Sequence, residues 1–144
     1  MSLRIVPSFE PLMTSFKKKG FSLLPHQKKA VRWMFSRETT SKSTKGGILA
    51  DEMGVGKTIE TIGLMMYHKV QYTLIIVPAS LITQWKSEIE KFTSDITIHI
   101  HKLDETNINV GLNIVITSFV KSTRDHIMEH QWGRIVIDEA HTIR

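Results

Sequence analysis

Short apolar runs recur along the chain and are separated by longer amphipathic stretches. The runs are rich in Ile, Leu and Val, which is typical of strands. The run at 73–77 is continuous rather than alternating, as expected for a strand that is covered on both faces. The predicted strands lie at residues 48–50, 73–77, 96–100, 113–117 and 134–137.

The stretches between the apolar runs have the period of helices. After Pro25, for example, four apolar side chains form one stripe, namely Ala30, Val31, Met34 and Phe35. Strands that alternate with helices predict an α/β fold with a parallel sheet, whose ligand sites lie at the carboxyl ends of the strands. The predicted helices cover residues 26–37, 57–68, 81–92 and 120–131.

The N-terminal segment lacks this periodicity. Pro11 and Gly20 interrupt it. The run Lys17–Lys19 is interpreted as a solvated surface, and a DNA contact is the alternative. We therefore expect an irregular segment at residues 1–21, followed by a single α/β unit at residues 22–144.

Basic residues are concentrated in the first third of the chain. Residues 1–45 hold ten Lys and Arg against two Asp and Glu, whereas residues 46–144 hold nine against twelve. A basic N-terminal segment before a nearly neutral remainder is typical of a protein with a polyanionic partner such as nucleic acid. It is also consistent with a solvated surface.

The composition of the 144 residues excludes several classes of protein. Hydrophobic residues make up 41%, which argues against a disordered tail. There is no cysteine, so disulfide scaffolds and thiolate metal sites are excluded. No apolar run approaches the roughly 20 residues of a membrane helix, and the N-terminus lacks the apolar core of a secretory signal. These features predict an intracellular protein of the nucleus or cytoplasm, with no membrane partner.

A glycine-containing segment between a predicted strand and a predicted helix indicates a phosphate-binding loop. Glycines let backbone N–H groups face an anion, and the helix that follows adds the positive end of its dipole. Lys57 can reach the β- and γ-phosphates, and the Thr58 hydroxyl can bind Mg²⁺. The alternative is a simple glycine turn before Lys-Thr, which the strand–loop–helix context disfavours. The candidate nucleotide-binding residues are Asp51, Glu52, Met53, Gly54, Val55, Gly56, Lys57 and Thr58.

Two adjacent acids end the last predicted strand. In phosphoryl transfer the metal ion needs a carboxylate, and the attacking water needs a residue that orients it. Asp138 would hold Mg²⁺ through water, and Glu139 would orient the attacking water. The alternative is an exposed turn with two solvated acids, but a phosphate loop about 80 residues earlier favours the catalytic pair.

Together these motifs resemble the first RecA-like lobe of superfamily 2 helicase-like ATPases, and most closely the SWI/SNF-type DNA translocases and chromatin remodellers. The loop begins with Asp51 where the general pattern has glycine, which is the habit of that family. The resemblance covers residues 22–144. The matching segments are LLPHQKKAVRWM (23–34), GGILADEMGVGKT (46–58), LIIVPASLITQWK (74–86), ITSF (116–119) and DEAH (138–141).

The resemblance implies a three-layer RecA-like fold, a parallel sheet with helices on both faces, and ATP and Mg²⁺ as cofactors. It implies that Gln27 contacts adenine, that Thr58 and Asp138 serve the metal, and that Lys57 and Glu139 act with Asp138 in catalysis. It also implies that His141 links the nucleotide and nucleic-acid sites. The residues implied to contact the backbone of duplex DNA are Pro78, Ala79, Ser80, Thr117 and Ser118.

The function implied is that of the ATP-binding lobe of a DNA-dependent ATPase that moves along duplex DNA. A strand-separating DNA or RNA helicase is an alternative, and a non-catalytic ATP-binding interaction module is an alternative of another class. Family members continue with a further strand, expected between those ending at Ala50 and Ile137, and with a second RecA-like lobe that completes the ATP site. The parent protein is thus expected to be an ATP hydrolase, and this truncated first lobe alone is expected to be nearly inactive.

Other candidate residues are interpreted as structural. Trp33 and Trp85 lie on predicted helices and are expected mainly to pack. His99 and His101 share one face of a predicted strand, and without a third ligand they are interpreted as a solvated face rather than a metal site.

Overall fold

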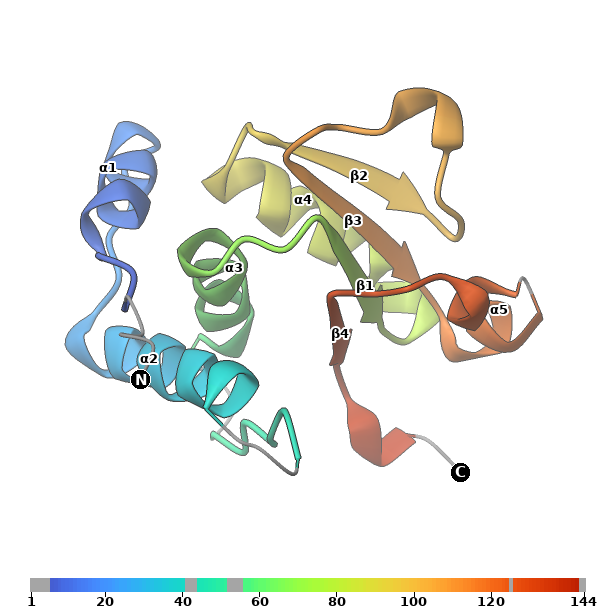
Figure 1. The fold of residues 1–144 in the computed structure, drawn as a ribbon, viewed down its shortest axis with the longest axis horizontal. Coiled ribbons are helices and arrows are strands. Elements are labelled where there is room, and N and C mark those ends of the chain that lie inside the picture. The colour runs from blue at the N-terminus through green and yellow to red at the C-terminus, as the bar shows by residue number, and fades with distance from the viewer. Residues whose placement is uncertain (1–5, 41–43, 52–55, 125, 143–144) are drawn as a thin grey trace, which may run out of the picture. The chain divides into compact units, whose positions relative to one another are not determined.

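Within the described residues, four parallel strands form one sheet in the order β2-β3-β1-β4 (Figure 1). The computed structural model describes residues 6–40, 44–51, 56–124 and 126–142. The central strands β1 and β3 are almost wholly buried, as their continuous apolar runs predict. The parallel α/β sheet is therefore confirmed. The strands are β1 (Tyr72–Ile76), β2 (Ile96–Ile100), β3 (Leu112–Thr117) and β4 (Arg134–Ile137).

The chain consists of two compact units, residues 1–69 and residues 70–144. The first unit contains three helices within its described residues, and the second contains the sheet. Among the described residues, no helix combines the length and the apolar character needed to cross a membrane.

Two helices connect the strands of the second unit. Helix α4 (Ile82–Phe92) joins β1 to β2, and helix α5 (Phe119–Arg124) begins the connection from β3 to β4. The two connections run in opposite directions across the sheet, so right-handed crossovers place their helices on opposite faces. One face is covered by Phe119, Ile127 and Trp132, which pack on Leu74, Ile76 and Val115.

The register of the strands aligns their carboxyl ends. Ile76 of β1 lies opposite Thr117 of β3 and opposite Ile137 of β4. The ladder continues one residue further, because Val77 N–H donates to the Thr117 carbonyl and Asp138 N–H donates to the Ile76 carbonyl, both at 3.0 Å. The segments that follow β1, β3 and β4 therefore leave the sheet at one shared edge.

A buried amide ties β3 to the loops before it. Asn113 is fully buried, and its Oδ1 accepts the N–H of Asn109 at 2.8 Å. Its Nδ2 donates to the carbonyl of Asn109 at 2.7 Å and to that of Gln71 at 3.4 Å. His99 Nε2 faces the same Oδ1 at 3.5 Å, while Nδ1 of His99 accepts the N–H of Asp104 at 3.2 Å. Both nitrogens of His99 thus have protein partners.

The expectation of a solvated face at His99 and His101 is therefore wrong for His99, which is only 5% exposed. Strand β2 pairs with β3 in a register that turns His99 toward the fully buried Asn113. His101 is half-buried at the end of the strand, and its Nδ1 lies 3.4 Å from the Thr117 hydroxyl. Both histidines take part in the packing of the sheet.

The N-terminal segment is helical rather than irregular. Helix α1 spans Glu10–Lys18, with Pro11 in its first turn and with Leu12 and Phe16 buried. Proline is favourable at that place because the first N–H groups of a helix have no partner within it. The predicted interruption at Pro11 is therefore wrong, because Pro11 lies at the start of the helix.

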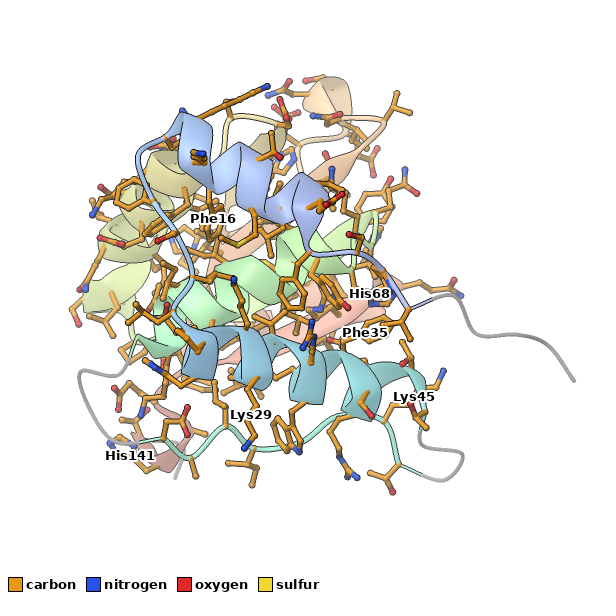
Figure 2. The ribbon with its side chains drawn as sticks, turned by 90° about the vertical axis from the view of Figure 1, so that its left-hand side faces the viewer. Phe16, Lys29, Phe35, Lys45, His68 and His141 are labelled. Atoms are coloured by element: carbon orange, nitrogen blue, oxygen red, sulfur yellow. The ribbon has the colours of Figure 1, made fainter. Side chains whose placement is uncertain are left out.

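Helices α2 (Pro25–Thr39) and α3 (Lys57–Tyr67) confirm their predicted positions. They approach closely at Gly63, where a Cβ would lie 3.1 Å from a methyl group of Val31. Figure 2 shows Phe35 of α2 beside His68, and their ring centroids are 5.2 Å apart. Phe35 also meets Tyr67 edge-on at 5.3 Å. These contacts join α2 to α3 and to the residue that follows it.

The residues before α1 are fixed to this core. The Tyr67 hydroxyl donates to the carbonyl of Pro7 at 2.7 Å, and the ring of Phe9 stacks on that of Tyr67 with centroids 4.5 Å apart. The guanidinium of Arg32 lies over the ring of Phe9, 4.8 Å from the ring centroid. Basic residues of α2 therefore contribute to packing as well as to surface charge.

The strand predicted at residues 48–50 is not formed. These residues have no regular structure, and Ile48 is 85% exposed. A strand needs a neighbour whose backbone groups satisfy its own. Within the described residues β4 pairs with β1 alone, so the sheet ends at β4, where a further strand was expected between β4 and residues 48–50.

The helix predicted at residues 120–131 is shorter than expected. Helix α5 ends at Arg124, and a separate short 3-10 turn follows at Ile127–Glu129 after His126 in a left-handed conformation. Near the end of α5, the Ser122 hydroxyl donates to the main-chain carbonyl of Phe119 at 2.8 Å. Such bonds offer the backbone an alternative to continued helix.

Candidate functional site

The predicted phosphate loop leads into the N-terminus of α3. Gly56 stands at the N-cap with φ 91°, a left-handed conformation that favours glycine. The N–H groups of the first turn of a helix have no partner within it and attract anions together with the helix dipole. The predicted residues Glu52, Met53, Gly54 and Val55 lie outside the described residues.

Gln27 packs against the start of α3. A Cβ built on Gly56 would lie 2.6 Å from Nε2 of Gln27. The Oε1 atom of the same amide accepts the N–H of Leu24 at 2.9 Å, which caps the start of α2. The adenine contact expected of Gln27 stays a prediction, and the same amide caps the start of α2 and lies close to Gly56.

Lys57 and Thr58 form the first turn of α3 and are half-buried. The ammonium group of Lys57 donates to the main-chain carbonyl of Asp51. A cation that reaches back across its own loop can exchange this neutral acceptor for a charged phosphate, which makes the stronger hydrogen bond.

Glu60 is a buried acid one turn into the same helix, and the sequence interpretation did not single it out. Its side chain is fully buried, and neither carboxyl oxygen has a well-formed hydrogen bond within the described part of the chain. Burial and, next, the negative charge of Asp51 raise the pKa of Glu60 from 4.5 to about 7, against the opposing effect of His26 and Lys57. The signal was an acid among the apolar residues of the helix.

The raised pKa of Glu60 predicts that the free energy of unfolding depends on pH. Because its pKa is raised on folding, its stabilising contribution is full below pH 4.5 and is lost as the pH rises through about 7. Glu60→Gln should remove this dependence. Between pH 5 and pH 8 the free energy of unfolding of the wild type should fall by about 1–2 kcal/mol more than that of the variant, with solvent screening allowed for. Urea unfolding at both pH values measures the difference.

Glu90→Gln is the matched control for this prediction, because Glu90 is exposed and pairs with Lys86 at 2.9 Å. It should leave the pH profile of the wild type unchanged. If the free energies of unfolding of the wild type and of Glu60→Gln changed equally with pH, Glu60 would not titrate in this range.

The acid pair lies at the shared carboxyl edge of the sheet. Asp138 follows β4, and both of its carboxylate oxygens accept hydrogen bonds. Oδ1 accepts the N–H of Glu139 at 2.9 Å, and Oδ2 accepts the indole N–H of Trp85 at 2.9 Å. A carboxylate has about four lone-pair sites, so each oxygen can still accept a hydrogen bond from water bound to a metal ion.

Glu139 has φ 53°, a conformation that few non-glycine residues adopt and that is often found at functional sites. The carbonyl of Glu139 accepts both the N–H and the hydroxyl of Thr142, at 2.9 and 2.8 Å, which stabilises this turn. Its carboxylate lies 3.3 Å from Nδ1 of His141, and both side chains are exposed. The coupling role of His141 stays a prediction, and its contact with Glu139 is now established.

Two segments predicted to contact nucleic acid follow neighbouring strands and share this edge. Ala79 and Ser80 are exposed in a 3-10 turn after Pro78. The hydroxyl of Thr117, in contrast, is buried beside His101. Ser118 is 7% exposed, and its hydroxyl accepts a hydrogen bond from a backbone N–H of α5.

Trp85 is the residue at this edge whose contact was missed. It was expected mainly to pack, and it is indeed only 4% exposed, but its polar N–H reaches Asp138. A buried tryptophan usually needs a partner for its N–H, and this was the available signal.

Comparisons with known proteins identify the family of the chain. A family model described as SNF2-related domain matches residues 26–144. The chain is 32% identical over 139 residues to Helicase SWR1 of Debaryomyces hansenii, which covers 85% of this chain and 8% of that protein. It is 33% identical over 153 residues to ATP-dependent DNA helicase DDM1 of Arabidopsis thaliana, which covers 93% of this chain and 19% of that protein.

A solved structure matches as well. It is the Sulfolobus solfataricus SWI2/SNF2 ATPase core in complex with dsDNA, with a TM-score of 0.69 and 32% identity over 85% of this chain and 27% of that chain. The chain thus spans about a quarter or less of the proteins it resembles. Its parallel sheet has the RecA-like arrangement of such cores. Since the family model matches most of its length, the chain belongs to the SNF2-related domain family.

Proposed function

We propose that this chain is the ATP-binding lobe of a DNA-dependent ATPase that moves along duplex DNA. The observation that carries the proposal is the likeness to an ATPase core solved on dsDNA, joined to a glycine–lysine segment at the start of α3. Relatives named as helicases support the same conclusion.

The residues of the first unit fit the phosphates of ATP. Gly56 has a left-handed conformation at the N-cap of α3, the Lys57 ammonium donates to a neutral carbonyl that a phosphate can replace, and the Thr58 hydroxyl stands in the first turn. In this proposal Lys57 binds the terminal phosphates, Thr58 binds Mg²⁺, and Gln27 contacts adenine. The remaining predicted loop residues, from Asp51 to Val55, are assigned to phosphate binding in the same proposal.

The acid pair fits the metal and the attacking water. Asp138 is held in one orientation by two N–H donors and retains acceptor capacity for water on Mg²⁺. Glu139 has an exposed carboxylate that orients the attacking water. When bound, Mg²⁺ would neutralise charge on the phosphates. His141, in contact with Glu139, is assigned to coupling with nucleic acid.

The carboxyl edge of the sheet is assigned to the DNA backbone. The exposed turn at Ala79 and Ser80 supplies backbone N–H groups and a hydroxyl. Because the hydroxyls of Thr117 and Ser118 already bond within the protein, we assign to these two residues backbone contacts rather than hydroxyl contacts. Contacts of this kind position a protein on DNA without reading its sequence.

The test is phosphate release by the protein that contains this chain, with duplex DNA, with single-stranded DNA and without DNA. Duplexes of unrelated sequence should stimulate turnover equally, and the stimulation should weaken with salt as counterions stay on the DNA. A scrambled-sequence duplex serves as the matched control. Stimulation by one sequence alone, or none at any salt concentration, would refute a backbone-tracking ATPase.

Two further outcomes identify the alternatives. Strand separation measured on a forked substrate would assign a helicase rather than a translocase of intact duplex. Tight ATP binding without turnover under any condition would assign a non-catalytic ATP-binding module.

A further inference from the structure

A hydrogen bond joins two residues 53 positions apart, Trp85 of α4 and Asp138 after β4. The indole N–H donates to Oδ2 of Asp138 at 2.9 Å, while the N–H of Glu139 donates to Oδ1 at 2.9 Å. The two donors approach different oxygens of one carboxylate. Together they fix the rotation of the carboxylate plane, which neither would fix alone.

The core of the second unit holds the indole itself in place. Trp85 is 4% exposed and belongs to a buried stripe of α4 with Ile89 and Phe92. Helix α4 contacts β3, a central strand that is buried along its whole length. The direction of the indole N–H is therefore set by packing, and an indole N–H can donate but cannot accept.

Helix α4 begins close to the carboxyl edge of the sheet. A 3-10 turn at Ala79–Leu81 leads directly into the helix, and Leu81 N–H donates to the Pro78 carbonyl at 2.9 Å. Trp85 thus stands in the first turns of a helix that starts at the carboxyl edge, on the same edge as Asp138. Packing alone would not require an N–H aimed at this particular carboxylate.

We propose that Trp85 is a positioning residue for Asp138, and that its indole N–H holds the carboxylate in the orientation that receives hydrated Mg²⁺. This inference rests on the proposed role of Asp138 in metal binding. Groups that orient a metal-binding side chain are worth about 10–100-fold in metal affinity. An indole that only packs would contribute nothing to Mg²⁺ dependence.

The first measurement is the nuclear magnetic resonance of the indole N–H groups in the full chain. The sequence has three tryptophans, which Trp→Phe variants assign one by one. Asp138→Asn should move the Trp85 signal, because a charged acceptor is replaced by a neutral one, and should leave the other two in place. ATP with Mg²⁺ should move it as well, whereas ATP with EDTA should not.

The second measurement is the affinity for ATP with Mg²⁺ and with EDTA. Trp85→Phe keeps most of the packing and loses the N–H, so the gain in affinity from Mg²⁺ should fall about 10-fold while the affinity in EDTA stays the same. Trp132→Phe is the matched control, because its indole donates to the carbonyl of Ile127 at 2.8 Å and should not affect Mg²⁺ dependence.

The outcomes separate this inference from the proposed function. If the wild type binds no ATP, the proposed function fails and the positioning role fails with it. If the wild type responds to Mg²⁺ and Trp85→Phe responds equally, the positioning role alone is overturned. Should Trp85→Phe not fold, Asp138→Asn decides, since a Trp85 signal that does not move in that variant also overturns the positioning role.

Discussion

Replacing Lys57 by alanine is expected to remove most of the affinity of this chain for ATP. The ammonium group stands directly after Gly56, at the start of α3, and at present donates to the neutral carbonyl of Asp51. Hydrogen bonds to charged groups are worth about 1.5–3 kcal/mol each. The expected loss is therefore on the order of 10–100-fold in Kd, measured by equilibrium binding of a fluorescent ATP analogue.

Lys86→Ala is the control for this experiment. Lys86 is a half-buried lysine that pairs with Glu90 on α4 and has no assigned role in nucleotide binding. It should bind the analogue as the wild type does. If Lys57→Ala also binds with wild-type affinity while its thermal unfolding is normal, the segment before α3 is not a phosphate loop.

Asn113→Ala is expected to produce the largest loss of stability. Its side chain is fully buried and bonds to both main-chain groups of Asn109, to Gln71 and to His99. Alanine would leave several of these buried groups without partners, at about 1–3 kcal/mol each. We expect a loss of about 3 kcal/mol in the free energy of unfolding, measured by urea denaturation.

Asn107→Ala provides the comparison, because Asn107 lies exposed in a short 3-10 turn of the same connection. It should change the free energy of unfolding by less than about 0.5 kcal/mol, as is usual for surface positions. A similarly small change in Asn113→Ala would mean that the buried hydrogen bonds contribute little to this fold.

The strands of the second unit could be predicted from the sequence, because a strand that is buried on both faces must be apolar along its whole length. The run at 73–77 and the run at 113–117 match β1 and β3 within one residue at each end. The acid pair could be placed at the carboxyl edge for the same reason, since parallel strands end together. Local composition was sufficient for these features.

Features that depend on a distant partner could not be predicted in this way. Whether His99 is solvated depends on the register of β2 against Asn113, and the N–H of Trp85 depends on where β4 ends. Residues 48–50 have a strand-like composition, but a strand also needs a neighbour. Pairing partners are a property of the tertiary structure, and no local pattern records them.

The N-terminal helix α1 could not be predicted for a different reason. Pro11 reads as a helix breaker when its position relative to the helix is unknown, and as a helix starter once Leu12 and Phe16 are seen to be buried. The same residue type therefore has opposite meanings one turn apart.

The common register at the carboxyl edge also determines where this chain can change in length. Three strands end level with one another at Ile76, Thr117 and Ile137. One residue inserted within any of them would advance the segment that follows by about 3.3 Å and turn its side chains to the opposite face. The exposed 3-10 turn Glu105–Asn107, in the connection from β2 to β3, is not paired in the sheet and carries no such constraint. In evolution, insertions and deletions are therefore expected to accumulate in connections of this kind and to spare the strands.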